Sequence, residues 1–383
     1  MKRNIKKFLF PAVAVAALCF AACSDWTETE SLDINYPTLE EQNPELYKQY
    51  LQALRDYKAG DHKIVFVSMN NTTAAPAQRN EHLTTMPDSV DFICLMNPAN
   101  LHPTLAGEFA KVREKGTRVI YNIDYNAIEK LWEKVLEEEE ADKPGEPGEP
   151  TDPDTPEATQ DGGGEGGDDG GLTPEQELEL RFLEFCKQQT VSQLNLCAEY
   201  GYDGVQVNYT GRAPQAMQDE EKALYAARQE AFFSNVEAWQ EAYPAKVLVF
   251  QGNPQNLVDN SVLAICDYIV IPALSALSTD EMSFAVLMAA VEGVPTDRFV
   301  IGVTVPSIVD LSNENGYFSG YEADGKTRVR ATKGAAQWAV NAVPNYTKLG
   351  ISVADAQYDY FNLTLVYKNI REAIDIMNPA PKN

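Results

Sequence analysis

Eight apolar runs that each end in polar residues determine most of what this chain can fold into. They cover Lys63–Asn71, Val90–Asn97, Arg118–Tyr125, Asp203–Tyr209, Val247–Asn253, Asp267–Ala273, Arg298–Ser307 and Ile351–Tyr360. Helical spacing of apolar residues marks five segments between or after the runs: Leu105–Lys115, Pro174–Glu199, Ala216–Ala242, Glu281–Glu292 and Leu363–Met377. Near-continuous apolar strands that alternate with helices are typical of a parallel sheet covered on both faces. The pattern leaves two arrangements, a closed (β/α)8 barrel and an open, doubly wound sheet.

The number of units and a missing motif favour the barrel. Eight strand–helix units in about 290 residues fit the usual size of a (β/α)8 barrel. No GxGxxG, the turn that an open dinucleotide-binding sheet uses, follows the first run. We therefore predict an α/β protein in which residues 61–380 form a TIM barrel. The excursion Leu311–Gln337 is predicted to be a long loop at the carboxyl ends of the strands.

An acidic segment interrupts this pattern. Residues 137–172 hold 14 acidic residues and one lysine, with Pro-Gly-Glu repeats followed by Gly/Asp runs. With almost no apolar side chain to bury, the segment is predicted to be a disordered, low-complexity insertion in the barrel. A calcium loop is the alternative, but it needs ligands at fixed positions, and residues 161–169 contain no matching repeat.

The overall charge and the small number of metal-binding residues exclude several functions. The net charge is −26, so phosphate groups meet a field of their own sign, and we expect no nucleic-acid partner. The chain has three histidines and six cysteines, and neither CxxC nor HExxH occurs in it. The sequence thus predicts no metal site and no cofactor.

The N-terminus predicts the cellular compartment. Four basic residues precede the apolar stretch 8–22, which is too short for a permanent membrane span and ends in small residues, as secretory signals do. Cys23 follows Ala21-Ala22 directly and resembles the acylated cysteine of bacterial lipoproteins. The alternative is an ordinary signal peptide that is cleaved nearby, with Cys23 unmodified. The acidic stretch 24–30 resembles the export signal of surface lipoproteins in glycan-foraging Gram-negative bacteria. We therefore expect a signal peptide at 1–22, a tether and lead-in at 23–60, and a lipid anchor in the outer membrane facing the exterior.

The ends of the apolar runs share one kind of chemistry. Amides, phenols and a few carboxylates occupy them: Asn70, Asn71, Asn97, Asp124, Tyr125, Asn208, Tyr209, Thr210, Gln251, Asn253, Gln357, Tyr358 and Asp359. Amides donate and accept hydrogen bonds as sugar hydroxyls do, and tyrosine rings offer apolar faces. Because barrel proteins build their sites where the strands end, the pattern favours a hydroxyl-rich ligand. A single such residue can instead cap a turn.

The fourth run carries a family resemblance. Glu199–Thr210 resembles the fourth strand of glycoside hydrolase family 18, which includes chitinases and endo-β-N-acetylglucosaminidases and has the motif DGxDxDxE. Asp203 and Gly204 match its start, and Val205 and Val207 match its apolar positions. Asp267–Ile271 is similar to the family's sixth strand, although the Tyr-Asp pair beyond it is absent. The resemblance extends over Asp61–Met377 and implies a TIM barrel that binds N-acetylglucosamine-containing glycans.

This chain differs from the motif at the positions of the catalytic acids. Gln206, Asn208 and Thr210 stand where the family has three further acids. In the family the last acid protonates the glycosidic oxygen, and the acid before it orients the substrate's acetamido group, whose carbonyl oxygen is the nucleophile. A threonine hydroxyl supplies no proton near neutral pH, and general acid catalysis contributes about 10²–10⁴-fold. An alternative is that these three are ordinary barrel residues that were never part of a hydrolase site.

The resemblance and the strand ends together predict a degenerate site that holds glycan without cutting it. The predicted glycan-binding residues are Asp203, Gln206, Asn208, Thr210, Tyr209, Asn97, Asp124, Gln251, Asn253 and Tyr358; no catalytic residue is assigned, because Thr210 occupies the acid position. The expected ligand is an N-glycan or a chitooligosaccharide, captured for a polysaccharide-utilisation system and its outer-membrane importer. Two alternatives are an active endo-glycosidase whose acid is Asp124 or Asp359, and a structural subunit of an uptake complex.

Overall fold

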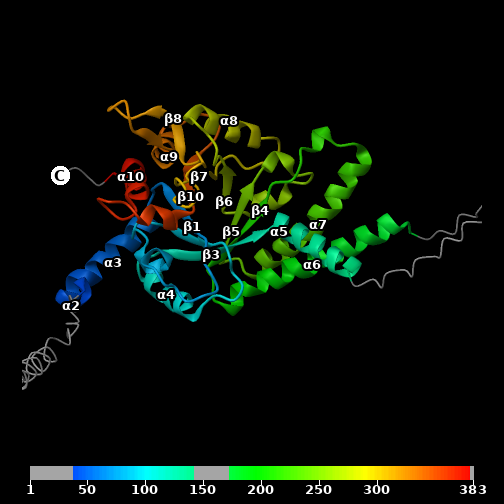
Figure 1. Ribbon diagram of the computed structural model, residues 1–383, viewed down its shortest axis with the longest axis horizontal. Coiled ribbons are helices and arrows are strands. Elements are labelled where there is room, and N and C mark those ends of the chain that lie inside the picture. The colour runs from blue at the N-terminus through cyan, green and yellow to red at the C-terminus, as the bar shows by residue number, and fades with distance from the viewer. Residues whose placement is uncertain (1–37, 142–171, 380–383) are drawn as a thin grey trace, which may run out of the picture. The chain divides into compact units, whose positions relative to one another are not determined.

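The computed structural model describes residues 38–141 and 172–379, and it contains a closed barrel of eight parallel strands (Figure 1). The strands are β1 (Ile64–Met69), β2 (Phe92–Leu95), β3 (Arg118–Asp124), β4 (Gly204–Tyr209), β5 (Val247–Gly252), β6 (Tyr268–Pro272), β7 (Phe299–Thr304) and β10 (Lys348–Ala354). Around the barrel their order is β1-β10-β7-β6-β5-β4-β3-β2. The predicted TIM barrel is confirmed, and each predicted run contains or overlaps one strand.

Helices follow most of the strands. They are α2 (Leu39–Gln42), α3 (Pro44–Ala59), α4 (Pro103–Glu114), α5 (Tyr125–Ala141), α6 (Pro174–Glu199), α7 (Asp219–Ala242), α8 (Thr279–Ala289), α9 (Ala331–Val340) and α10 (Lys368–Met377). Two compact units are distinguished, Met1–Tyr50 and Leu51–Asn383, and the second contains the barrel. Within the described ranges, no helix combines the length and the apolar character that a membrane span requires.

Several predicted boundaries are wrong, among them the start of the last helix, which lies at Lys368 and not at Leu363. Helix α5 continues through Ala141, so residues 137–141 of the expected insertion are helical. Trp132 of this helix packs on Phe185 of α6, with ring centroids 5.2 Å apart, and this contact stabilises α5. The remainder of that prediction, residues 142–171, lies outside the described residues, as do the signal peptide and Cys23. The eighth strand begins at Lys348, and the predicted strand residues 356–360 form a 3-10 helix.

The excursion after β7 is more regular than a loop. It contains the antiparallel hairpin of β8 (Tyr317–Tyr321) and β9 (Arg328–Arg330), and it leads directly into α9. Phe318 of β8 is buried in the main core, and the Ser319 N–H donates to the Leu277 backbone oxygen at 3.0 Å, so contacts with the rest of the protein support the hairpin together with strand pairing.

Alternation along the strands divides the apolar residues between two cores. One core fills the barrel and consists of Phe66, Phe92, Cys94, Ile120, Val247, Val249, Val270 and Val300. The residues of opposite parity, such as Val205, Val207 and Phe250, join the larger core between the barrel and its helices. Position parity on a strand therefore decides whether a side chain faces the barrel interior or the helices.

Three aspartates stabilise the base of the barrel, the end where the strands begin. Asp91, Asp203 and Asp267 each come immediately before an even-numbered strand, and each accepts a hydrogen bond from a backbone N–H of the preceding strand. The donors are Val65 at 2.8 Å, Val119 at 2.8 Å and Leu248 at 2.9 Å. Each carboxylate thus provides an acceptor for a strand N–H at the base of the barrel.

Candidate functional site

Three polar side chains lie in one row at the mouth, the end where the strands finish. Asp124 of β3 is in register with Asn208 of β4, and Asn208 is in register with Gln251 of β5. All three have the parity of the barrel-filling residues and are half-buried. Within residues 38–141 and 172–379, neither the Asn208 nor the Gln251 carboxamide has a hydrogen-bond partner. The row therefore presents amide groups that are free to bind a ligand.

A buried polar pair lies one layer below this row. Gln206 donates from Nε2 to Oδ1 of Asn122 at 3.1 Å, and both side chains are buried. The Gln206 amide is thus engaged within the protein by Asn122. The contact of Gln206 with glycan stays a prediction; in the structure, its side chain lies between the apolar barrel core and Asn208 along β4.

Thr210, which the motif resemblance predicts to stand at the acid position, is held in place by amides. Thr210 accepts a hydrogen bond at Oγ1 from Nδ2 of Asn126, at 2.9 Å. Its backbone oxygen accepts from Nδ2 of Asn253 at 3.2 Å and of Asn256 at 2.7 Å. Asn253 therefore uses its amide nitrogen to fix the loop after β4. Asn126 and Asn256 had no signal in the sequence apart from their nearness to strand ends.

Two glycines permit this arrangement. Gly252 has φ +146°, and a Cβ there would lie 1.8 Å from the Tyr209 backbone oxygen. The same close approach lets the Asn253 N–H donate to that oxygen at 3.2 Å. At Gly204, a Cβ would lie 2.2 Å from the Val247 oxygen. Both glycines allow β4 and β5 to lie closer together than residues with side chains permit.

A cavity of about 720 Å³ lies on the other side of the mouth, where β1, β2 and β10 end. Its lining includes the predicted residues Asn97 and Tyr358 together with Asn70, Asn71, Asn80 and Gln357. The Asn97 Nδ2 donates to Asn70 Oδ1 at 2.9 Å and to the Asn71 backbone oxygen at 2.6 Å. Asn80 is buried, and its Oδ1 has no hydrogen-bond partner in the described part of the chain. A buried, unpaired amide oxygen is costly unless a ligand or water satisfies it.

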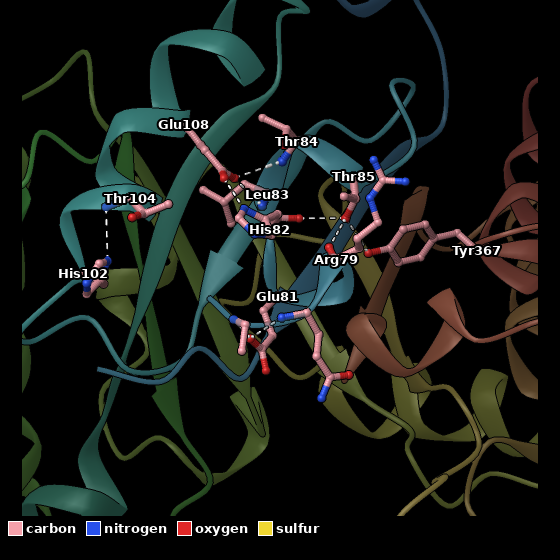
Figure 2. A network of polar contacts seen from close by, with 12 residues as sticks. Arg79, Glu81, His82, Leu83, Thr84, Thr85, His102, Thr104, Glu108 and Tyr367 are labelled. Atoms are coloured by element: carbon pink, nitrogen blue, oxygen red, sulfur yellow. Dashed lines mark hydrogen bonds and ion pairs between the residues drawn. The ribbon is translucent and has the colours of Figure 1, made fainter. Parts of the chain in front are cut away.

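The loop that supplies Asn80 and Glu81 is tied down on two sides (Figure 2). On one side, Glu108 of α4 accepts from the His82 ring at 2.5 Å and from the backbone N–H of Leu83 at 2.7 Å. On the other side, the Thr85 hydroxyl lies 3.0 Å from the hydroxyl of Tyr367, just before α10. No sequence pattern predicts that this loop forms part of the mouth, because its residues come together only through these long-range contacts.

Two residues predicted to contact glycan, Asp203 and Tyr209, do not face the mouth, so these predictions are wrong. Asp203 lies at the base, where its carboxylate accepts from Arg113 Nε at 3.0 Å and from the Val119 N–H. Tyr209 points away from the barrel interior and is 1% exposed; Gln229 of α7 donates to its hydroxyl at 2.8 Å, and burial raises the pKa of that phenol to about 12. Both side chains therefore stabilise the fold and do not face the mouth.

The acidic residues near the end of β10 also differ from expectation. Asp359 is 2% exposed, and its carboxylate accepts hydrogen bonds from the side chains of Asn362 and Asn369. It also accepts from the N–H of Ile370 and so caps the start of α10. Asp359 therefore cannot serve as the alternative acid. Asp355, which sequence reasoning missed, comes directly after β10 in a left-handed backbone conformation, φ 54°. Burial raises the pKa of its carboxyl above the ordinary range.

The comparison with protein families agrees with this architecture. A family description, glycoside hydrolase family 18, BT1044-like, matches residues 27–154 and 180–376, which is most of the chain. The chain belongs to glycoside hydrolase family 18. The family match stops at residue 154 and resumes at 180, so it omits much of the acidic segment.

Solved structures of family 18 members share the fold. A selenomethionine form of BT1044 with a Glu-to-Gln substitution has a TM-score of 0.58 and 17% identity, over 90% of this chain and 96% of that chain. The endo-β-N-acetylglucosaminidase from Cordyceps militaris, in apo form, has a TM-score of 0.55 and 14% identity, over 86% and 95%. At such identities the likeness concerns the barrel alone. A comparison with curated protein sequences finds no match.

The family assignment clarifies which parts of the motif this chain retains. The retained residues, Asp203 and Gly204, act at the base and in strand packing. Of Gln206, Asn208 and Thr210, which the motif comparison predicts to replace the family's acids, the last two lie at the mouth. The described ranges contain no group of three or more His, Cys, Asp or Glu side chains that could hold a metal ion.

Proposed function

We propose that this family 18 protein binds N-acetylglucosamine-containing glycans at its barrel mouth and does not hydrolyse them. The observation that carries the proposal is the row of Asp124, Asn208 and Gln251, with two unpaired amides beside the neutral residue Thr210. An amide recognises an acetamido group or a hydroxyl by donating and accepting hydrogen bonds. Such recognition stabilises the bound substrate without stabilising a charged transition state.

The neutral side chains argue against the chemistry of the family's active members. In the family mechanism, an acid protonates the leaving oxygen and a carboxylate supports the positively charged intermediate. At the corresponding positions of this chain, Thr210 has only a hydroxyl, already held by Asn126, and Asn208 has no charge. Binding to the ground state is retained, and the acceleration that depends on charge is lost.

The apolar surface for a sugar ring would come from Tyr358. This residue lines the 720 Å³ cavity and is half-buried, whereas Tyr209 packs against the helices. The cavity and the amide row belong to the two halves of the same mouth, so an extended oligosaccharide can contact both. Residues Asn97 and Gln251 would then bind different sugars of one chain.

We also propose that the protein is a surface lipoprotein that captures glycan for an outer-membrane importer. The support is the signal-like stretch 8–22, Cys23 after two alanines, and the acidic stretch 24–30. A Cys23→Ala variant should be released or remain an uncleaved precursor, because one or more acyl chains at about 0.8 kcal/mol per CH₂ provide the anchor. Mature, lipid-labelled protein in this variant would contradict the proposal.

A residual hydrolase is the second candidate, and one observation favours it. Asp124 is a half-buried carboxylate adjacent to Asn208, and its only hydrogen-bond donor in the described ranges is the Asn126 N–H, at 2.9 Å. If it acts as the acid, Asp124→Asn should abolish turnover while leaving glycan affinity nearly unchanged.

Binding and turnover measured together test the proposal. Titration calorimetry with a chitooligosaccharide and with an N-glycan should give saturable binding, and product analysis of the same samples should give no cleavage. The double variant Asn208→Asp, Thr210→Glu restores the family's acids, and even weak endo-glycosidase activity from it would support a degenerate site. Turnover by the wild type that survives Asp124→Asn would contradict the proposal, and absence of binding to both glycans would favour a purely structural subunit.

A further inference from the structure

A second cavity, of about 560 Å³, lies between the β8–β9 hairpin and the helices α9 and α10. Its lining holds five cationic side chains, Arg328, Arg330, Lys333, Lys368 and Arg371, and three acidic ones, Glu322, Glu372 and Asp375. Cationic groups are in excess here although the whole chain carries −26. A local reversal of charge in a cavity attracts anions that the rest of the surface repels.

The ion pairs of the cavity involve only some of these charges. Lys333 is paired with Glu322 at 2.8 Å and with Glu372 at 3.2 Å. Within residues 38–141 and 172–379, Lys368 and Arg371 form no ion pair, and they are three positions apart on α10. Because residues at this spacing share one face of a helix, the two unpaired charges can converge on one ligand.

Arg330 supplies the most specific feature of the cavity. Its guanidinium lies over the ring of Tyr317, with the central carbon 4.5 Å from the ring centroid, and Arg328 lies over the same ring at 4.8 Å. The Nη1 atom of Arg330 is buried and has no hydrogen-bond partner in the described part of the chain. A buried guanidinium N–H without an acceptor is unfavourable, and two adjacent N–H groups fit the two oxygens of an oxyanion.

The cavity is close to the mouth along the chain. Tyr358 lines the amide-rich cavity and Asn362 lines this one, so their Cα atoms are at most about 14 Å apart even for a fully extended chain. Figure 1 shows α9, α10 and the strand β8 grouped on one side of the barrel, next to β7 and β10. A glycan of several sugars held at the mouth can reach this distance.

We propose that this basic cavity binds the oxyanion of an acidic sugar, a carboxylate or a sulfate ester, at the far end of the glycan that occupies the mouth. The proposal rests on the proposed function, since it adds a preference for acidic glycans to the same binding event. Arg330 and Lys368 hold the oxyanion, and Tyr317 keeps the guanidinium groups in position.

Matched pairs of neutral and acidic ligands test this proposal. Affinity is measured by calorimetry for a sialylated N-glycan and its desialylated counterpart, and for chitotriose with and without a 6-O-sulfate. The wild type should bind at least one acidic member about tenfold more tightly than its neutral partner, as a charge-assisted hydrogen bond implies. The pair that shows the difference identifies a carboxylate or a sulfate as the bound group.

Variants assign the preference to the cavity. Lys368→Gln changes an exposed side chain, and Arg330→Gln removes the buried N–H; each should lower affinity for the acidic ligand towards that for the neutral one. Lys326→Gln, an exposed lysine of the same hairpin outside the cavity lining, should leave the preference intact. Equal affinity for both members of both pairs, or a preference that survives Lys368→Gln and Arg330→Gln, overturns the proposal.

A further measurement separates this proposal from the proposed function. Free N-acetylneuraminic acid and free glucosamine 6-sulfate carry the oxyanions without a glycan chain, so their binding does not depend on the mouth. Weak binding of one of them that Lys368→Gln abolishes supports the cavity even if neutral glycans fail to bind. Neutral binding without any response to the oxyanion leaves the proposed function standing and overturns the acidic-sugar site.

Discussion

The two ends of the barrel use polar side chains in opposite ways, and β4 contains both cases. At the base, Asp203 accepts hydrogen bonds from Arg113 and from the neighbouring strand. Five positions later, at the mouth, the Asn208 carboxamide has no partner in the described part of the chain. A polar group whose bonding capacity is used within the fold contributes stability, whereas one that is left unpaired at an open end can bind a ligand.

The same contrast holds for neighbouring strands. Asp91 and Asp267 repeat the role of Asp203 before β2 and β6. At the mouth, Gln251 repeats the role of Asn208 on β5. Position on the strand therefore decides the role of a polar side chain more than residue type does. A carboxylate of the family motif that precedes the strand, as Asp203 does, lies at the base and is not evidence of a catalytic or binding role.

The largest effect expected from this contrast is on stability. Asp203→Ala should lower the free energy of unfolding by about 2–3 kcal/mol, because it leaves Arg113 and the Val119 N–H without their acceptor. Urea unfolding measures the loss, and calorimetry should give unchanged glycan affinity. Reduced affinity in a variant of normal stability would show that the base also takes part in binding.

The reciprocal change at the mouth should affect binding alone. Asn208→Ala should weaken glycan binding by roughly 1–3 kcal/mol, since it removes an amide that pairs with the sugar. Its unfolding free energy should change by less than about 0.5 kcal/mol, because no hydrogen bond within the described ranges is lost. A stability loss as large as that of Asp203→Ala would erase the distinction between the two ends.

A smaller effect is expected for the acid at the mouth. Burial raises the folded-state pKa of Asp355, so the folded protein binds this proton more tightly than the unfolded chain does. Its stabilising contribution is thus complete below the ordinary aspartate pKa of about 3.9 and is lost as pH rises through the raised value. Asp355→Asn keeps a residue that tolerates the left-handed conformation, φ 54°, and removes the charge.

Thermal unfolding at several pH values measures this difference. The variant should melt slightly above the wild type near neutral pH and at the same temperature below about pH 4. A variant that is less stable at neutral pH would indicate that the Asp355 carboxylate has a favourable partner.

The smallest effect should come from the acidic segment. Glu139 of α5 and Arg181 of α6 form an ion pair at 2.5 Å, so the two helices already lie together where the segment joins them. Deleting residues 144–171 should leave melting temperature and glycan affinity nearly unchanged, because loop length enters stability only logarithmically. A collapse of folding, or calcium-dependent binding lost with the segment, would contradict the interpretation of it as a linker.

The sequence alone determined the barrel and part of the mouth. Strands of a parallel barrel are buried on both faces, so each one appears as a continuous apolar run, and the run's last residues lie at the mouth by topology. That logic correctly brought Asp124, Asn208 and Gln251 into one row and brought Asn97 and Tyr358 into one cavity. The motif comparison further predicts that Gln206, Asn208 and Thr210 stand where the family has acids, and this correspondence stays a prediction.

Only the tertiary structure decided which polar residues remain available for binding. The direction of a side chain and the identity of its partners depend on contacts far apart in the sequence, such as Gln229 with Tyr209 or Arg113 with Asp203. The loop carrying Asn80 likewise depends on long-range contacts, with α4 on one side and with Tyr367, just before α10, on the other. The basic cavity depends on the packing of Arg330 on the ring of Tyr317. Sequence patterns encode burial along a strand, whereas hydrogen-bond satisfaction arises only when the strands and loops have come together.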